Sequence, residues 1–238
     1  MKYSNKAVLA AAIAAASTQL MANGLALNEQ SASSAGSAYA GRASTAANAS
    51  TLYGNPAGMS RLDRAEVSGG LAFIDASTDI SNAQGTAPGT NDGDMVPFST
   101  VPFGYYVSPI NDRLHAGIGI YAPFGVESDY EDGWQGRYEG LNSVVQVVTI
   151  QPTISYAFND RVSVGFGPTI NHIEGKLTNN VSSVPFGGSG DAEVDIEGDD
   201  IAYGFNLGAL VAITDTLDWG LTYHSKVDYT LEGDTTVS

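Results

Sequence analysis

The chain has 238 residues, of which 43% are hydrophobic, and its mean hydropathy of −0.05 shows no hydrophobic excess. A transmembrane helix needs about 20 consecutive apolar residues, and the only candidate run, Ala7 to Ala16, is too short. Ten Lys and Arg residues against 26 Asp and Glu give a net charge of −16, which argues against nucleic acid as a partner because its phosphates would be repelled. Without Cys, no disulfide framework is available.

Residues 1–22 are typical of a secretory signal peptide. Lys2 and Lys6 precede an apolar stretch, and Leu20-Met21-Ala22 supplies a small residue at a plausible cleavage point. This order of charged, apolar and small residues marks a segment that is removed on export. The alternative is an Ala-rich amphipathic helix packed on the domain. It is disfavoured because the run has no polar face at helical spacing.

The mature chain changes character once. Residues 23–64 are rich in Ala, Ser and Gly and show no strand-like alternation, with one helix-compatible stretch from Ser33 to Ala43. From Ala65 onward apolar and polar residues alternate, which predicts strands with one apolar face. The clearest apolar faces are Val148, Ile150, Pro152, Ile154, Tyr156 and Phe158; Val162, Val164 and Phe166; Ile201, Tyr203, Phe205, Leu207, Ala209, Val211 and Ile213; and Trp219, Leu221, Tyr223, Val227, Tyr229 and Leu231.

Weaker alternation at 67–75, 101–107 and 114–124 raises the total to about seven strands, near the length that crosses a bilayer when tilted. The connections differ in length on the two sides. Short turns are predicted at 109–113, 159–161 and 214–216, and long polar loops at 77–97, 125–142 and 178–200. This asymmetry is typical of outer-membrane β-barrels.

A soluble β-sandwich is the main alternative fold, since its strands also alternate. Its strands usually run only about 5 to 6 residues. The apolar faces here place Tyr105, Tyr156, Tyr203 and Trp219 near strand ends, which suits the aromatic girdles of a membrane protein. The opposite faces are rich in Gly, Ser and Thr, which suits a barrel lumen. We therefore predict an all-β transmembrane antiparallel barrel.

Acidic residues gather in two predicted loops, at 127–131 and 191–200. Such clusters could bind divalent cations among lipopolysaccharide phosphates. We favour simple solvation, because the carboxylates lack the fixed ligand spacing of a dedicated site. No metal site or cofactor is predicted.

Two sets of motifs carry a family resemblance over essentially the whole mature chain. The first comprises Asn23 to Gln30, Gly36 to Gly41, and Asn55-Pro56-Ala57 followed by Asp63; the second comprises Ala122 to Gly125 and Trp134 to Tyr138. Together they resemble the FadL/TodX-type outer-membrane transporters of long-chain fatty acids and aromatic hydrocarbons. The resemblance implies a monomer assembled by the barrel-assembly machinery among outer-membrane lipid and lipopolysaccharide.

The resemblance also implies a barrel of fourteen strands, plugged by an N-terminal hatch. We therefore assign residues 23–64 to the hatch and residues 65–238 to the first half of the barrel. The chain stops at Ser238 without the family's aromatic terminal strand, so we expect a fragment. An open half-barrel in lipid would leave unpaired strand edges, each exposed group costing several kcal/mol.

The mechanism that the resemblance implies is capture of a hydrophobic ligand by outer loops, passage to the hatch, and exit sideways beside the third strand. Pro123 cannot donate to a β-ladder, and Gly119 and Gly125 weaken packing around it, so a kink at Pro123 and Phe124 has a physical cause. An ordinary strand end at Pro123 fits these residues equally well, and only the resemblance favours the exit.

Site residues are assigned on the same basis. Asn55-Pro56-Ala57 alone predicts only a turn, but together with Asp63 and the preceding motif it is expected to hold the hatch against the wall. Arg137 and Lys226 could attract a carboxylate headgroup, although solvation or an internal ion pair is the commoner role of such residues.

Four functions stay open. Uptake of long-chain fatty acids is the leading hypothesis, with uptake of aromatic hydrocarbons or alkanes as its alternative. A general porin is disfavoured because a plug would block water and ions. An outer-membrane lipase is a remote competitor, since His115, His172 and His224 lie far apart and no Gly-x-Ser-x-Gly motif is present. No catalytic residue is predicted.

Overall fold

A computed structural model describes residues 26–78, 80, 82, 85, 87–90, 94–188 and 190–238. The predicted signal peptide lies outside these residues. No helix in the described part of the chain is long and apolar enough to cross a membrane.

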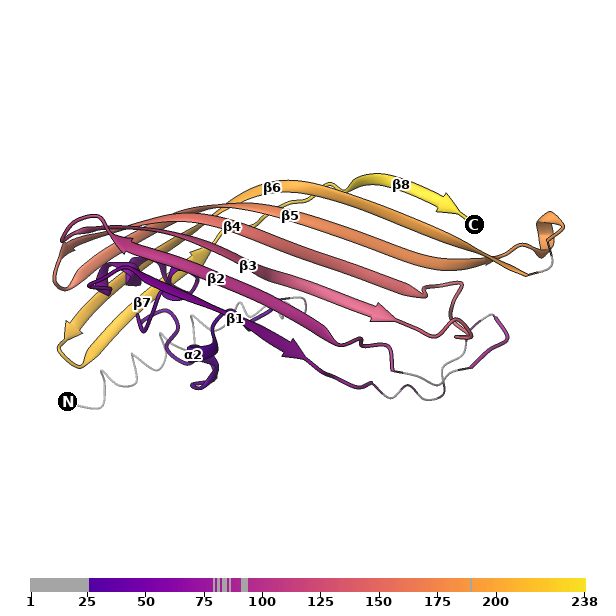
Figure 1. Cartoon of the computed structure of the whole chain (residues 1–238), viewed down its shortest axis with the longest axis horizontal. Helices are drawn as coiled ribbons and strands as arrows, with labels where there is room; N and C mark the ends of the chain where they lie inside the picture. Colours follow the sequence, from indigo (N-terminus) through magenta and orange to yellow (C-terminus); the bar gives the residue numbers. More distant parts are fainter. Residues whose placement is uncertain are drawn as a thin grey trace, which may run out of the picture.

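The chain forms one curled antiparallel sheet, a half-barrel (Figure 1). Strands β1 to β7 follow one another in order across the sheet, and β8 pairs with β6 beyond the end of β7. The predicted all-β antiparallel fold is confirmed. The strands are β1 (Glu66–Ile74), β2 (Ser99–Pro109), β3 (Leu114–Asp129), β4 (Asn142–Asn159), β5 (Val162–Ser182), β6 (Asp191–Thr214), β7 (Leu217–His224) and β8 (Glu232–Val237).

Residues 26–65, which we call the inner segment, lie against the concave face near the short turns (Figure 1). They contain α2 (Ala32–Ala35), α3 (Thr51–Gly54) and the 3-10 helix η1 (Pro56–Arg61), and a second 3-10 helix, η2 (Val184–Phe186), caps the β5–β6 hairpin. The helix predicted for 33–43 ends after one turn. The chain leaves helical geometry at Ala38 and Tyr39, both of which have positive φ.

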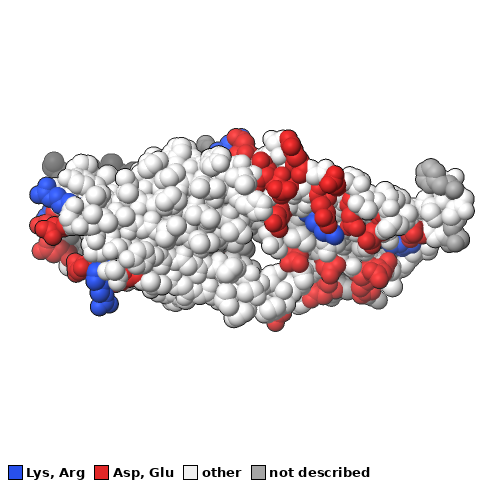
Figure 2. All heavy atoms as spheres, turned by 45° about the horizontal axis from the view of Figure 1, so that its top comes forward, with Lys and Arg blue, Asp and Glu red and all other residues white. Residues whose placement is uncertain are grey.

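Side-chain facing follows the predicted alternation along most strands. Ile154 on β4 is 55% exposed on the convex face, whereas its neighbour Thr153 is 3% exposed on the concave face. From Val148 to Phe158 the outward positions are apolar over about 33 Å of strand, which is about 25 Å of height at a tilt near 40°. That height matches the apolar band of an outer-membrane barrel. Figure 2 shows the broad uncharged surface, with acidic side chains gathered beyond it.

Several sequence expectations are wrong. β7 ends at His224, so Val227, Tyr229 and Leu231 lie outside the strand that was predicted to contain them. The predicted loop 178–200 is mostly strand, because β5 runs to Ser182 and β6 starts at Asp191. Residues 191–197 do alternate, with Ala192, Val194 and Ile196 on one face, but the acidic residues between them were interpreted as a polar loop. Tyr105 does not belong to an outer aromatic girdle: it is 2% exposed and faces inward. It joins a core in which Leu52 and Met59 of the inner segment pack against Phe103 and Tyr121 of the wall.

Candidate functional site

The Asn55-Pro56-Ala57 motif begins η1 and fixes its direction. The Asn55 side-chain oxygen accepts a hydrogen bond from the Ala57 N–H at 3.0 Å, and Pro56 occupies the first helical position, where its missing N–H costs nothing. The Asn55 side-chain amide donates to the carbonyls of Ala43 at 2.6 Å and of Ala209 on β6 at 3.0 Å. One side chain therefore joins the turn, the inner segment and the wall.

The wall also holds the backbone of the inner segment. The Ala57 carbonyl accepts from the hydroxyls of Ser155 on β4 at 3.1 Å and Ser163 on β5 at 3.0 Å. On β7, Thr222 donates to the Gly54 carbonyl at 2.8 Å. On β3, the His115 Nε2 lies 3.1 Å from the Leu62 carbonyl. The small polar side chains of the concave face thus satisfy carbonyls that docking removes from water.

Glycines let the motif approach the wall this closely. Gly165 on β5 and Gly208 on β6 are register partners. A methyl group on Gly165 would collide with Pro56 and Ala57, and one on Gly208 would collide with the Asn55 side chain. Only a residue without a side chain fits at either position.

Asp63 is not brought together with the other motif residues. It is exposed, and among the described residues it has no hydrogen bond or ion pair. The ionic anchor in this region is Arg61, whose guanidinium donates two hydrogen bonds, of 2.7 and 2.8 Å, to Asp218 at the start of β7. No local sequence pattern indicates this pair, because its members are 157 residues apart.

The wall has a gap between β2 and β3. The two strands pair from Pro109↔His115 to Phe103↔Tyr121 and no further, although β1 pairs with β2 as far as Ser99 and β3 pairs with β4 as far as Asp129. At the same point the β3–β4 register shifts between Tyr121 and Phe124. A bulge at Pro123, which lacks an N–H, therefore coincides with the place where the ladder stops.

The start of the inner segment closes this gap. The Leu27 N–H donates to the Pro123 carbonyl at 2.9 Å, and Ala26 forms a bridge with Phe124. The Gln30 side-chain amide donates to the Ala122 carbonyl at 2.5 Å. Pro123, Phe124 and Gly125 all lie in this region, with a methyl group on Gly125 falling 3.3 Å from Leu27. Gly119 lies outside it, in ladders that are continuous with both β2 and β4.

A belt of polar side chains crosses the concave face beside the inner segment. Gln151 on β4 accepts hydrogen bonds from the Tyr121 hydroxyl at 2.5 Å and from the Asn206 amide at 2.7 Å. Asn206 in turn contacts the His224 Nδ1 at 2.8 Å. Tyr53 of α3 packs edge-on against Tyr121, with ring centroids 4.8 Å apart. The inward parity of these residues was the only sequence signal for the belt, since no motif links them.

The two candidate headgroup cations are already paired. Arg137 Nε lies 2.7 Å from a carboxylate oxygen of Asp191, whose other oxygen accepts from the Tyr138 hydroxyl at 2.7 Å. The hydrogen bond from Tyr138, and then that from Arg137, lowers the pKa of Asp191. Lys226 forms an ion pair with Asp228. Arg137 therefore ties the loop after β3 to the β5–β6 hairpin.

Comparison with known proteins decides the family. The family model described as "Outer membrane protein transport protein (OMPP1/FadL/TodX)" matches residues 13–238. The chain belongs to the OMPP1/FadL/TodX family. It is accordingly an outer-membrane protein of a family of transport proteins, with the half-barrel as its membrane-facing part.

Relatives of this OMPP1/FadL/TodX chain include the long-chain fatty acid transport protein of Escherichia coli O6:H1, 29% identical over 255 residues that cover 96% of the chain and 56% of the relative. Outer membrane protein P1 of Haemophilus influenzae is 29% identical over 272 residues, covering 96% and 59%. The chain thus spans a little over half of these relatives. A crystal structure of a Pseudomonas aeruginosa FadL homologue has the same fold, with a TM-score of 0.70 at 23% identity and coverage of 90% of this chain and 55% of that one. The "CymD monoaromatic hydrocarbon channel" matches with a TM-score of 0.54 at 16% identity, over 82% and 53%.

Proposed function

We propose that the complete protein takes up hydrophobic small molecules, foremost long-chain fatty acids, through the outer membrane and releases them sideways at the β2–β3 gap. The inner segment, with residues 23–64, acts as the hatch. The observation that supports this proposal is the stretch of β3 around Pro123 that has no ladder partner on β2 and is covered by Ala26, Leu27 and Gln30 of the inner segment. A wall that is closed by a separate segment can open without breaking the β-ladder between neighbouring strands.

Energetics favour a lateral route for an apolar ligand. Each CH₂ group kept out of water is worth about 0.8 kcal/mol, so a fatty acid gains nothing by entering the aqueous periplasm. The gap is bordered on the outer face by Ile118 and Ile120, which are exposed in the apolar band. A ligand that displaces Leu27 would therefore pass from the inside of the barrel into the apolar part of the membrane without crossing water.

The relatives support the ligand class at two levels. The Escherichia coli relative is named a long-chain fatty acid transport protein, which favours fatty acids. The structural neighbour named a monoaromatic hydrocarbon channel keeps aromatic hydrocarbons as a second candidate. A general porin is disfavoured because the inner segment occupies the concave face. We assign no enzymatic activity, and we expect lipopolysaccharide and the barrel-assembly machinery as partners of the complete protein.

The double variant Pro123→Val and Gly125→Val tests the exit. Valine restores a backbone donor at 123, and at 125 its side chain meets Leu27, so the bulge should straighten and the gap should close. We expect lower uptake of labelled long-chain fatty acid per assembled barrel, at an unchanged amount in the outer membrane. The control, Pro152→Val with Gly104→Val, makes the same changes on outward positions of β4 and β2. Normal uptake by the Pro123/Gly125 variant would overturn the lateral route, and a parallel assay with toluene separates the two ligand classes.

A further inference from the structure

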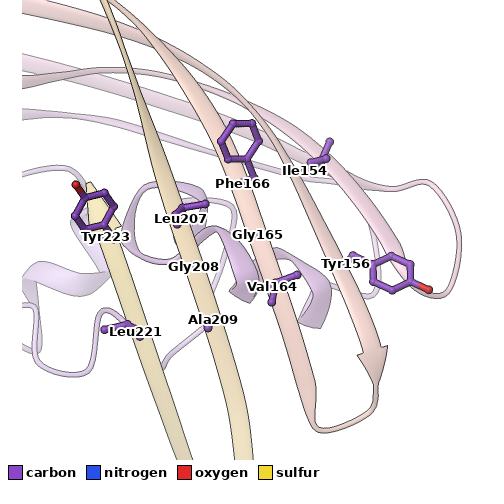
Figure 3. A pocket seen from close by; sticks show the side chains of 10 residues that line it. All are labelled: Ile154, Tyr156, Val164, Gly165, Phe166, Leu207, Gly208, Ala209, Leu221 and Tyr223. Atoms are coloured by element: carbon purple, nitrogen blue, oxygen red, sulfur yellow. The ribbon is translucent and has the colours of Figure 1, made fainter. Parts of the chain in front are cut away.

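The convex face of the half-barrel carries a hollow of about 420 Å³ over β4 to β7 (Figure 3). Gly165 and Gly208 lie at its centre, and outward-facing apolar side chains surround them. Val164 and Phe166 border it on β5, Leu207 and Ala209 on β6, and Leu221 on β7. No charged side chain lines the hollow. Its volume lies within the range of about 300 to 1,000 Å³ that is usual for small-molecule sites.

The floor of the hollow is backbone. Gly165 and Gly208 are register partners at inward-facing positions, and Asn55, Pro56 and Ala57 cover their concave side. On the convex side the hollow is bounded by the outward side chains of neighbouring positions. Ala209 carries the smallest of these side chains, and this leaves the space beside Val164 and Leu221 open.

Its position assigns the hollow to one side of the membrane. It lies inside the uncharged band and close to the short turn that joins β4 at Asn159 to β5 at Val162. In outer-membrane barrels the short turns face the periplasm. The surroundings of the hollow are therefore the phospholipid acyl chains of the periplasmic leaflet.

We propose that this hollow seats one acyl chain of a phospholipid from that leaflet. Lipid tails are as apolar as the wall, so the hydrophobic effect does not select between hollow and bilayer. The gain comes from dispersion contacts, because a chain in the hollow touches side chains on several sides instead of one. A flexible acyl tail can pass between the bordering side chains and reach the backbone at Gly165 and Gly208. A second copy of the protein would present a face of projecting side chains. These would rest on the border of the hollow and leave its floor uncovered. This proposal rests on the membrane location of the wall and is independent of the ligand that the barrel transports.

The test fills the hollow from the membrane side. Ala209→Phe places a ring among Val164, Leu207 and Leu221, whereas the control Val148→Phe puts the same ring at an outward position of β4 that does not line the hollow. The complete protein is reconstituted with phosphatidylethanolamine, transferred to a mild detergent, and weighed by native mass spectrometry. We expect one retained phospholipid in the wild type and the control. In Ala209→Phe the retained-to-free lipid ratio should fall about tenfold, equivalent to about 1.4 kcal/mol.

Three outcomes would overturn the proposal. The wild type could retain no phospholipid, Ala209→Phe could retain as much as the control, or the species lost on substitution could be a dimer of the protein. Ala209→Leu, a smaller addition that is compatible with any outward position, should give an intermediate loss and guards against misfolding of the Phe variant. Fatty-acid uptake by the same variants is measured separately, so that failure of the lipid site and failure of the proposed transport are distinguishable.

Discussion

At the scale of single residues, the inner segment lies so close to the wall that it limits the size of the side chains on the concave face. Gly165 and Gly208 admit Asn55 to Ala57, and the hydroxyls of Ser155 and Ser163 satisfy the Ala57 carbonyl. The Gly, Ser and Thr content of the inward face was interpreted from the sequence as a polar lumen. The structure shows a second reason why these residues are small: larger side chains would displace the inner segment.

We therefore expect Gly165→Val to release η1 from the wall. Valine suits a strand better than glycine, so the strand itself should not weaken. The added side chain cannot share the space with Pro56 and Ala57. The prediction is a rise in passive ion conductance of the complete barrel in planar bilayers, at an unchanged level of assembly. Gly104→Val is the matched control, since a methyl group at Gly104 meets nothing within 4 Å; equal conductance of the two variants would refute the prediction.

At the scale of strands, two positions on the outward face of β4 show how depth in the membrane controls tolerance to charge. Ile154 lies near the middle of the outward apolar series, and Gln146 lies on the same face and strand beyond its upper end. An arginine costs roughly 2 to 4 kcal/mol at the bilayer midplane and about 0 to 1 near the interface.

Ile154→Arg should accordingly reduce the free energy of unfolding of the complete protein by about 2 to 4 kcal/mol, and Gln146→Arg by no more than about 1 kcal/mol. Urea titration in lipid vesicles, followed by heat-modifiable migration, measures both. Glu174, which is opposite Gln146 on β5, gives the arginine of the control a possible counter-charge. If both variants unfold at the same urea concentration, β4 does not cross the membrane at this depth.

The strands that could be predicted from the sequence are those with one face toward lipid and the other toward the inner segment. Ile154 and Thr153 alternate because one faces lipid and the other the inner segment. The upper part of the β5–β6 hairpin was missed although it alternates, with Ala192, Val194 and Ile196 opposite in facing to Lys176 and Glu197. Its outward residues are charged because it lies beyond the apolar band, and this charge was interpreted as a solvated loop. Tyr105 was assigned to the wrong face because an aromatic residue packs equally well against lipid and against Leu52. Contacts such as Gln30 to Ala122 bring together residues with no shared motif, so periodicity could not reveal them.

At the scale of the whole molecule, the outer loops are tied to one another by a small ionic cluster. Arg137 joins the carboxylate of Asp191 to the Pro88 carbonyl, at 2.9 Å from the latter, and Tyr138 shares the same carboxylate. Three segments far apart in the sequence therefore meet at the guanidinium group of Arg137.

This cluster should loosen in acid. The hydrogen bonds from Tyr138 and Arg137 lower the pKa of Asp191. A carboxylate whose pKa is lower in the folded state stabilises that state above its ordinary pKa, and the contribution is lost as the pH falls through the depressed folded value. Hydrogen exchange of residues 134–140, corrected for the intrinsic effect of pH, should therefore rise as the pH falls below the ordinary aspartate pKa of about 4. Asp191→Asn should exchange faster at neutral pH and lose this acid-dependent rise; an unchanged pH profile would contradict the assignment.

The anchors of the inner segment have a consequence for the order of assembly. The hydrogen bonds among them come from β3, β4, β5, β6 and β7, which are successive strands, and β2 adds apolar packing through residues such as Phe103. A segment made first in synthesis is thus held by strands that follow it at once. If further strands follow, the sheet would close around a lumen that is already filled, so the chain would never have to thread its own N-terminal part into a finished ring. The barrel would then close and become plugged in the same step, so that no empty, ion-permeable barrel forms as an assembly intermediate.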